Sequence, residues 1–342
     1  MVLLSDKKLL LFSRNILLIL LIPTFILCST SCKKENIVVD SPEKITIAYS
    51  TAVNAIVMYI AFAKGYLAEE GLDATPQPHA FGKLALDAVL DVQADLATVA
   101  DTPIVLAVMN GKKITMLAVI QTSNRDNAIV ARRDRGIASP SDLKAKRIGV
   151  KLGTAAEFFA EAFLLAHDID RASVKFIDMK PDEMAAALGT GRVDAVSIFN
   201  PTLNLLEKEL GNKGAVFFGE SIYTETFCLA AMQDYVKKHP ETIKKVLRAL
   251  IRAETFIQQN PEEARRIVAD FIKIDKLLLD QIWPIWTTKI TLDQALLVDL
   301  EDQTRWALKK RMAADNDMPN YLDFIYVDAL LAVKHEAVRI LR

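Results

Sequence analysis

The chain has 342 residues, of which 51% are hydrophobic and 25% charged, a composition typical of a folded globular protein. Its 42 Lys and Arg residues are balanced by 43 Asp and Glu residues, so no excess of positive charge is available for binding nucleic acid. The four histidines, at positions 79, 167, 239 and 335, are not paired at the spacing of metal ligands. We therefore expect no nucleic-acid partner, no metal and no cofactor.

The N-terminal segment has the pattern of an export signal. Lys7, Lys8 and Arg14 precede an apolar run over residues 16–27, which is shorter than the ~20 residues of a membrane span. Small residues then precede Cys32, as in a bacterial lipobox, although Ser29 stands where that motif usually has Leu. The alternative is an uncleaved anchor helix, which also leaves the remaining chain outside the cytoplasm.

We predict a lipoprotein signal peptide over residues 1–31, lipidation of Cys32 and a polar tether over residues 32–43. Burial of the acyl chains would hold the protein on the periplasmic or extracellular face of a bacterial membrane. With Cys32 lipidated, Cys228 has no disulfide partner in the mature chain and is predicted to be a small core residue.

Strands and helices alternate from Glu43 to about Ser221. We predict strands over residues 44–50, 94–100, 113–121, 147–150, 174–179, 193–199 and 215–220. Helices are predicted over residues 55–71, 83–91, 102–110, 155–168, 181–191 and 200–211. This alternation predicts an α/β architecture with largely parallel sheets. Beyond Ser221, amphipathic helices dominate, over residues 237–259, 261–273 and 291–311.

Two segments are similar to each other, residues 88–103 and residues 186–201. Each contains the end of a helix, an aspartate (Asp95 or Asp194), an apolar strand, a polar residue and a proline. Either the chain contains two similar halves that face the same way, or two short α/β units are alike by chance.

Candidate ligand-binding residues follow the predicted strands, because open α/β sheets bind ligands beyond the carboxyl ends of their strands. In the first half these are Ser50, Thr51, Asn54, Phe81, Gly82, Lys83, Asp101 and Thr102. In the second half they are Gly153, Thr154, Ala155 and Asn200, and Glu225 is a candidate for the cleft or hinge.

The corner Gly153-Thr154 is expected to bind an anion or a carbonyl oxygen, because N–H groups and the positive end of the dipole meet at a helix start. The alternative is that Thr154 only caps its own helix, which stabilises by ~1 kcal/mol. Lys83 is either solvated or paired with an acid such as Asp101 or with an anionic ligand. The sequence shows no nucleophile–base pair and no carboxylate dyad, which argues against hydrolysis and phosphoryl transfer.

Six segments carry a resemblance to a known family: KGYLAEEGLD, ADLATVADTP, SPSDLKAKRIGVKLGTAAEFF, ALGTGRVDAVSIFNP, YTETFCLAAMQDYVKKHPETIKKVLRAL and MPNYLDFIYVDALLAVKHEAV. In order and spacing they resemble the solute-binding proteins of nitrate, sulfonate and taurine ABC importers, a group that includes NMT1/THI5-like proteins. The resemblance covers residues 43–338.

This resemblance implies a two-lobe periplasmic-binding-protein fold of type 2 with extra C-terminal helices. Residues 44–126 and 222–342 would form lobe 1, residues 127–221 lobe 2, and the two crossings near residues 125–130 and 221–227 the hinge. A small polar or anionic solute would bind between the lobes and be delivered to an ABC permease in the membrane, and the protein would be a monomer without enzymatic activity.

Two positions depart from the family pattern. Val92 stands where the first turn usually has glycine, whereas Gly191 keeps it, so the first turn is expected to differ. Asn200 replaces the Glu of a common Trp-Glu-Pro motif, which favours a neutral or anionic ligand over an amine. A lyase- or pyrimidine-synthase-type enzyme on the same fold, using Asp101 or Glu225, and a ligand sensor for a membrane receptor are the alternative functions.

Overall fold

The computed structural model of the chain describes residues 41–312 and 317–341. The predicted signal peptide, Cys32 and nearly all of the tether lie outside the described residues. Across the described ranges, no helix combines the length and apolar character needed to cross a membrane.

The first sheet has six strands in the order β11-β4-β10-β3-β1-β2. They are β1 (Glu43–Ser50), β2 (Leu72–His79), β3 (Leu96–Ala100), β4 (Ile114–Ser123), β10 (Glu225–Met232) and β11 (Thr287–Thr291). Strand β1 is parallel to β2 and β3, whereas β10 is antiparallel to β3 and β4, and β11 is antiparallel to β4.

The second sheet has five strands in the order β7-β6-β8-β5-β9. They are β5 (Asn127–Arg132), β6 (Arg147–Val150), β7 (Lys175–Asp178), β8 (Ala195–Phe199) and β9 (Gly214–Phe218). Strand β6 is parallel to β7 and β8, and β5 is antiparallel to β8 and β9. The chain crosses between the sheets through residues 124–126 and 219–224. The expected α/β class is confirmed, but the sheets are mixed, because the strand that follows each crossing enters its sheet antiparallel to its neighbours.

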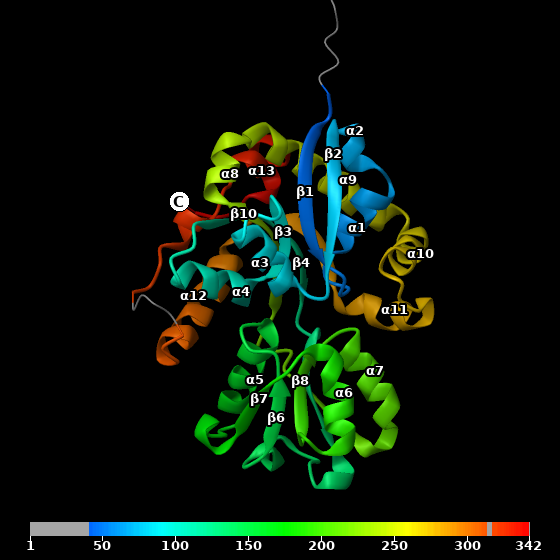
Figure 1. Cartoon of the computed structure of the whole chain (residues 1–342), viewed down its shortest axis with the longest axis vertical. Coiled ribbons are helices and arrows are strands. Elements are labelled where there is room, and N and C mark those ends of the chain that lie inside the picture. The colour runs from blue at the N-terminus through cyan, green and yellow to red at the C-terminus, as the bar shows by residue number, and fades with distance from the viewer. Residues whose placement is uncertain (1–40, 313–316, 342) are drawn as a thin grey trace, which may run out of the picture. The chain divides into compact units, whose positions relative to one another are not determined.

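Helices pack against both sheets (Figure 1). Around the first sheet, α3 packs on β1 and β3, α12 packs on α4, and α9 packs on α1 and α13. Around the second sheet, α5 packs on β5 and β8, and α6 packs on β6 and β8. The α-helices are α1 (Ile56–Ala63), α2 (Tyr66–Glu69), α3 (Gly82–Leu90), α4 (Asp101–Met109), α5 (Ala155–Ala166), α6 (Pro181–Thr190), α7 (Thr202–Leu210), α8 (Gln233–Lys238), α9 (Pro240–Gln259), α10 (Pro261–Ile272), α11 (Lys276–Ile282), α12 (Gln294–Lys309) and α13 (Asp328–Val333).

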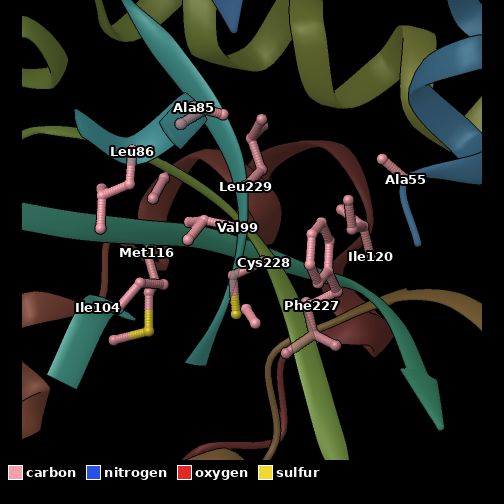
Figure 2. Close-up of a cluster of buried hydrophobic side chains, with 14 of the residues drawn as sticks. Ala55, Ala85, Leu86, Val99, Ile104, Met116, Ile120, Phe227, Cys228 and Leu229 are labelled. Carbon is pink, nitrogen blue, oxygen red and sulfur yellow. The ribbon is translucent and has the colours of Figure 1, made fainter. Parts of the chain in front are cut away.

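Strand β10 runs through the middle of the first sheet and is buried along almost its whole length. Figure 2 shows Cys228 of this strand among the side chains of Val99, Ile104 and Met116. The thiol side chain is fully buried and unpaired, which confirms the prediction that Cys228 is a core residue. A strand that is buried on both faces has no solvent side, and this explains why β10 is apolar from Phe227 to its end.

The internal repeat is confirmed by matching geometry in the two sheets. The Asp95 carboxylate accepts a hydrogen bond from Thr46 N at 2.7 Å, and the Asp194 carboxylate accepts one from Arg147 N at 2.8 Å. Each aspartate thereby joins the loop before a strand to the neighbouring parallel strand. The strand orders β2-β1-β3-β10-β4 and β7-β6-β8-β5-β9 correspond position by position.

Three local expectations were wrong. The helix predicted over residues 55–71 is interrupted, because Gly65 has a left-handed backbone (φ 72°) and separates α1 from α2. Strand β2 was missed, because Pro76 and Pro78 argue against a strand; prolines are tolerated there since β2 lies at a sheet edge and pairs only with β1. The turn at Val92 does not differ from its counterpart: φ is 59° at Val92 and 80° at Gly191.

Candidate ligand-binding site

Loops at the carboxyl ends of strands from both sheets surround one cavity. The loops and strands of the first sheet contribute Asn54, Phe81, Gly82, Lys83, Ala100, Pro103, Glu225 and Phe227, and the second sheet contributes Thr154, Ala155 and Phe199. The cavity, including its mouth, has a volume of about 310 Å³. This volume is at the lower end of the range for small-molecule sites, so it suits a solute of few heavy atoms.

Many of the residues proposed from the sequence lie at this cavity. The lining includes Asn54, Phe81, Gly82, Lys83, Thr154, Ala155 and Glu225. Gly153 lies directly beside it, since a Cβ atom on this glycine would be 3.3 Å from Cε of Lys83. Its φ of +74° is a conformation that favours glycine. The structure thus brings together the loop after β1, the start of α3 and the start of α5.

Ser50, Thr51 and Asn200 shape the surrounding loops without lining the cavity. The buried Ser50 hydroxyl accepts a hydrogen bond from Ala52 N at 3.1 Å, and the Thr51 hydroxyl donates to His79 O at 3.1 Å. Asn200 is 3% exposed, and its N–H donates to the Asp126 carboxylate at 3.3 Å. The Ser50 and Thr51 hydroxyls are engaged by their own loops, because each loop must satisfy its buried polar groups; at Asn200 the backbone N–H is paired, whereas the side-chain oxygen has no partner.

Asp101 and Thr102 do not line the cavity. Both are 0% exposed. The Asp101 carboxylate accepts hydrogen bonds from the Tyr223 hydroxyl at 2.5 Å, Thr226 N at 3.2 Å and Thr102 N at 2.8 Å. It joins the start of α4 to the second crossing, and burial raises its pKa to about 6 despite these donors.

The Gly153-Thr154 corner has an arrangement that the sequence did not predict. Gly153 N–H donates to the Glu157 carboxylate at 2.7 Å, so it is already occupied. The Thr154 hydroxyl donates to Lys151 O at 2.7 Å and makes no side-chain cap. The capping alternative for Thr154 is therefore wrong. The first N–H groups of α5, at Ala155 and Ala156, remain the donors that a helix start offers to an anion.

Lys83 pairs with Asp87 and not with Asp101. The Lys83 ammonium lies 2.8 Å from the Asp87 carboxylate, one turn further along α3. This pair is partly exposed, so it contributes little to stability and can be rearranged by an anion. Lys83 and the starts of α3 and α5 together make one wall of the cavity favourable for negative charge.

Glu225 supplies a buried carboxyl group to the same cavity. It is 6% exposed and accepts a hydrogen bond from Asn127 Nδ2 at 2.9 Å. Burial, followed by the nearby Asp126 and Asp101 carboxyl groups, raises the Glu225 pKa well above its ordinary range. The cavity therefore combines donors on two helix starts with a carboxyl group whose raised pKa favours its neutral form.

Sequence reasoning missed Ala100, Pro103, Phe199 and Phe227, which also line the cavity. These residues are apolar, and a search for hydroxyl, amide and charged groups passes over them. Phe199 and Ala100 each end a predicted strand, and this position was the available signal. Among the described residues, no group of three or more His, Cys, Asp and Glu side chains is placed to hold a metal ion.

Similar proteins are binding proteins of small solutes. The chain is 26% identical over 224 residues to a Bacillus subtilis protein named "Putative aliphatic sulfonates-binding protein", covering 65% of each chain. It is 23% identical over 230 residues to the taurine-binding periplasmic protein of Escherichia coli, covering 64% of this chain and 68% of that one. It is 25% identical over 256 residues to the formylaminopyrimidine-binding protein of Halalkalibacterium halodurans, covering 70% and 73%.

The fold is shared with solved structures. The periplasmic aliphatic sulphonate binding protein SsuA from Escherichia coli superposes with a TM-score of 0.72 at 18% identity, covering 84% of this chain and 99% of that chain. The desulfurization enzyme DSZB has the same fold at a TM-score of 0.61 and 14% identity, covering 86% and 99%. The type 2 periplasmic-binding-protein fold is thereby confirmed. The family model described as NMT1/THI5 like matches residues 52–264, and the chain therefore belongs to the NMT1/THI5-like family.

Proposed function

We propose that this protein is the solute-binding lipoprotein of an ABC importer and captures a small polar or anionic organic solute between two lobes. Lobe 1 comprises residues 44–126 and 222–342, and lobe 2 comprises residues 127–221. Lipidation at Cys32 holds it on the periplasmic or extracellular face of a bacterial membrane, where a membrane permease receives the solute. The solute belongs to the sulfonate, taurine, nitrate or pyrimidine-precursor class.

One observation carries this proposal: loops at the strand ends of both sheets line the same cavity. Asn54 and Lys83 reach it from the first sheet, and Thr154 and Phe199 reach it from the second. A solute that contacts residues of both lobes loses some of these contacts when the lobes separate. Its binding therefore favours the arrangement in which the lobes are close. The names of the taurine-, sulfonate- and formylaminopyrimidine-binding relatives support the solute class.

The cavity supports capture more than catalysis. Asp101, which an enzyme on this fold would use as an acid or base, is fully buried and held by three hydrogen bonds away from the cavity. Glu225 reaches the cavity without a hydroxyl or thiol nucleophile among the lining side chains other than Thr154, whose hydroxyl donates to Lys151 O.

Thermal unfolding of the full chain in detergent, screened against sulfonates, taurine, nitrate and pyrimidines, tests this proposal. A bound solute raises the free energy of unfolding by RT ln(1 + [L]/Kd), about 2.7 kcal/mol at a hundredfold excess over Kd. Small-angle scattering should show compaction with the same solute. Absence of stabilisation by every class, or steady conversion of a stabilising solute to product, contradicts the proposal.

Lipidation is tested separately by the mass of the protein isolated from a bacterial membrane. The expected mature chain begins at Cys32 and carries acyl chains. Cys32→Ser should leave the chain at its full length and free of acyl mass. Recovery of an unmodified wild-type chain that retains residues 1–31 would show that the N-terminal segment is an uncleaved anchor.

A further inference from the structure

A pair of carboxyl groups lies where the two crossings between the sheets meet. Asp126 is the last residue of the first crossing, and Glu225 begins β10 directly after the second. Asp126 is 1% exposed and Glu225 is 6% exposed. Both side chains line the same small cavity and are linked by a hydrogen bond, and the Asp126 charge adds to the rise of the Glu225 pKa.

Within residues 41–312 and 317–341, no lysine or arginine forms an ion pair with either carboxyl group. Arg125 is adjacent in sequence but pairs with Glu220, and Lys83 at the same cavity pairs with Asp87. Three further titratable groups interact with the pair: Asp101 and Tyr223 with Glu225, and Tyr59 with Asp126. The two phenols are neutral near pH 7. The field at the pair is therefore negative, and a proton or another cation must offset it.

Unpaired acceptor atoms surround this pair. The oxygens Asn54 Oδ1, Asp126 Oδ2, Asn127 Oδ1 and Asn200 Oδ1 are buried and have no hydrogen-bond partner. Asn54 is 7% exposed and, with Glu225, lines both the main cavity and an adjoining cavity of about 150 Å³ that also includes Asp126. Four orphaned acceptors with no donor are costly to bury, and they match a ligand group that is rich in N–H donors.

We propose that Asn54, Asp126 and Glu225, which line the adjoining cavity, form an acceptor pocket that binds a cationic nitrogen group of the solute, such as an ammonium or amidinium, and that Asn127 and Asn200 hold the two carboxyl groups in place. The carboxyl pair releases a proton to solvent when this group binds. This proposal rests on the proposed function and deepens it, since it selects solutes with a cationic nitrogen over solutes that carry only an anion. Because Asn200 replaces a glutamate of the family pattern, we expected a neutral or anionic ligand. The acceptor pocket reverses this expectation, since Asp126 and Glu225 supply carboxyl groups from other parts of the chain.

The acceptor pocket also predicts how affinity depends on pH. Burial raises the Asp126 pKa to about 6 and raises the Glu225 pKa further from its ordinary value. Protons therefore compete with the cationic group at low pH, and affinity rises as the pH increases from about 5 to about 8. A solute without a cationic nitrogen has no such competitor, and its affinity does not rise over this range.

The test uses the full chain in detergent and matched probe pairs: taurine with ethanesulfonate, homotaurine with propanesulfonate, and an (aminomethyl)pyrimidine with the corresponding methylpyrimidine. Thermal shift and isothermal titration calorimetry are measured for each. We expect the amino member of at least one pair to bind about ten- to hundredfold more tightly than its partner. Calorimetry in two buffers of different ionisation enthalpy should show proton release on binding.

Glu225→Gln and Asp126→Asn should abolish both the preference and the proton release. Asn54→Ala removes one acceptor without touching the carboxyl pair, and it should reduce the preference even if the acid variants fail to fold. Asp299→Asn is the matched control, because it removes a half-buried carboxyl group that does not line either cavity of the acceptor pocket; it should keep the preference.

The outcomes are distinguishable. Equal binding of both members of every pair overturns the acceptor pocket and leaves the proposed function intact. Stabilisation by no member of any pair overturns both proposals. A preference that survives in Glu225→Gln and Asp126→Asn also overturns the assignment. Equal stabilisation by Ca²⁺ or Zn²⁺ in the absence of solute would mean that the pair binds a metal ion instead.

Discussion

The turn at Val92 offers a direct measurement of backbone strain, because the chain contains the same turn with glycine. Val92 has φ 59° and its side chain is 86% exposed, so it gains almost nothing from packing. A residue with a Cβ atom in the left-handed region costs roughly 1–2 kcal/mol, and a β-branched residue is among the least favourable. Val92→Gly removes this cost but makes the unfolded chain more flexible, by about 0.4–1 kcal/mol.

The difference predicts that Val92→Gly stabilises the protein by about 0.5–1 kcal/mol. The assay is urea unfolding, in which the midpoint should rise while the slope m stays constant. Val92→Ala keeps a Cβ atom at the same φ and should change stability by less than about 0.5 kcal/mol, which separates strain from the loss of the valine side chain. A lower midpoint for Val92→Gly would refute the reasoning.

The reverse substitution at the matching turn should be harmful. Gly191 has φ 80°, and a Cβ atom there would lie 2.6 Å from Nη1 of Arg135. The Arg135 guanidinium donates to Leu188 O at 3.0 Å and to Gly189 O at 2.8 Å, so it would have to give up these bonds to move away. Backbone strain and the lost hydrogen bonds together predict that Gly191→Val destabilises by about 2–4 kcal/mol.

Three further predictions follow from the buried carboxyl groups and the loop beside the cavity. Burial and then the nearby Asp101 charge raise the Asp299 pKa to about 7, so its contribution to stability is complete below about pH 4 and is lost as the pH rises through about 7. Urea midpoints of the wild type should fall over that range and those of Asp299→Asn should fall less; parallel curves would contradict this. Asp101→Asn should lower the free energy of unfolding by about 1–3 kcal/mol, because one of the three groups that donate to the Asp101 carboxylate loses its acceptor. Gly153→Ala should cost about 1 kcal/mol, since φ is +74° and its Cβ atom would contact Lys83 at 3.3 Å; an unchanged midpoint would show that this loop adapts.

The parts of the fold that follow from local pattern were predictable. Helices such as α9 and α12 have one apolar face, and the strand within each repeated aspartate-to-proline unit is short and apolar, so the sequence pattern reveals both. Pairing partners were not predictable in this way. β10 lies between β3 and β4, more than a hundred residues away from either, and nothing in the segment TFCLAAM distinguishes a central strand from a buried helix.

The candidate site was predictable only to the level of loops. The rule that ligands bind beyond strand ends placed Asn54, Lys83 and Thr154 at one cavity. The same rule selected Asp101, whose side chain turns away from the cavity to Tyr223 and Thr226. Side-chain direction at a strand end depends on tertiary hydrogen bonds, and Asp126 was passed over because its partner Glu225 is distant in sequence and meets it only through the fold.

The positions of the two charged ends of the cavity give them different roles in the proposed mechanism. In a hinged rotation, displacement grows with distance from the axis, so Asp126 and Glu225 beside the crossings move least. A cationic group held there makes similar contacts whether the lobes are apart or together, and it adds affinity without favouring closure. The starts of α3 and α5 belong to different sheets and meet only when the lobes approach. An anionic group that contacts both therefore supplies the differential free energy that closure requires. By this reasoning Glu225→Gln weakens binding of an amino-sulfonate but leaves its compaction at saturation unchanged, whereas an amine that lacks the anionic group binds without compaction in scattering.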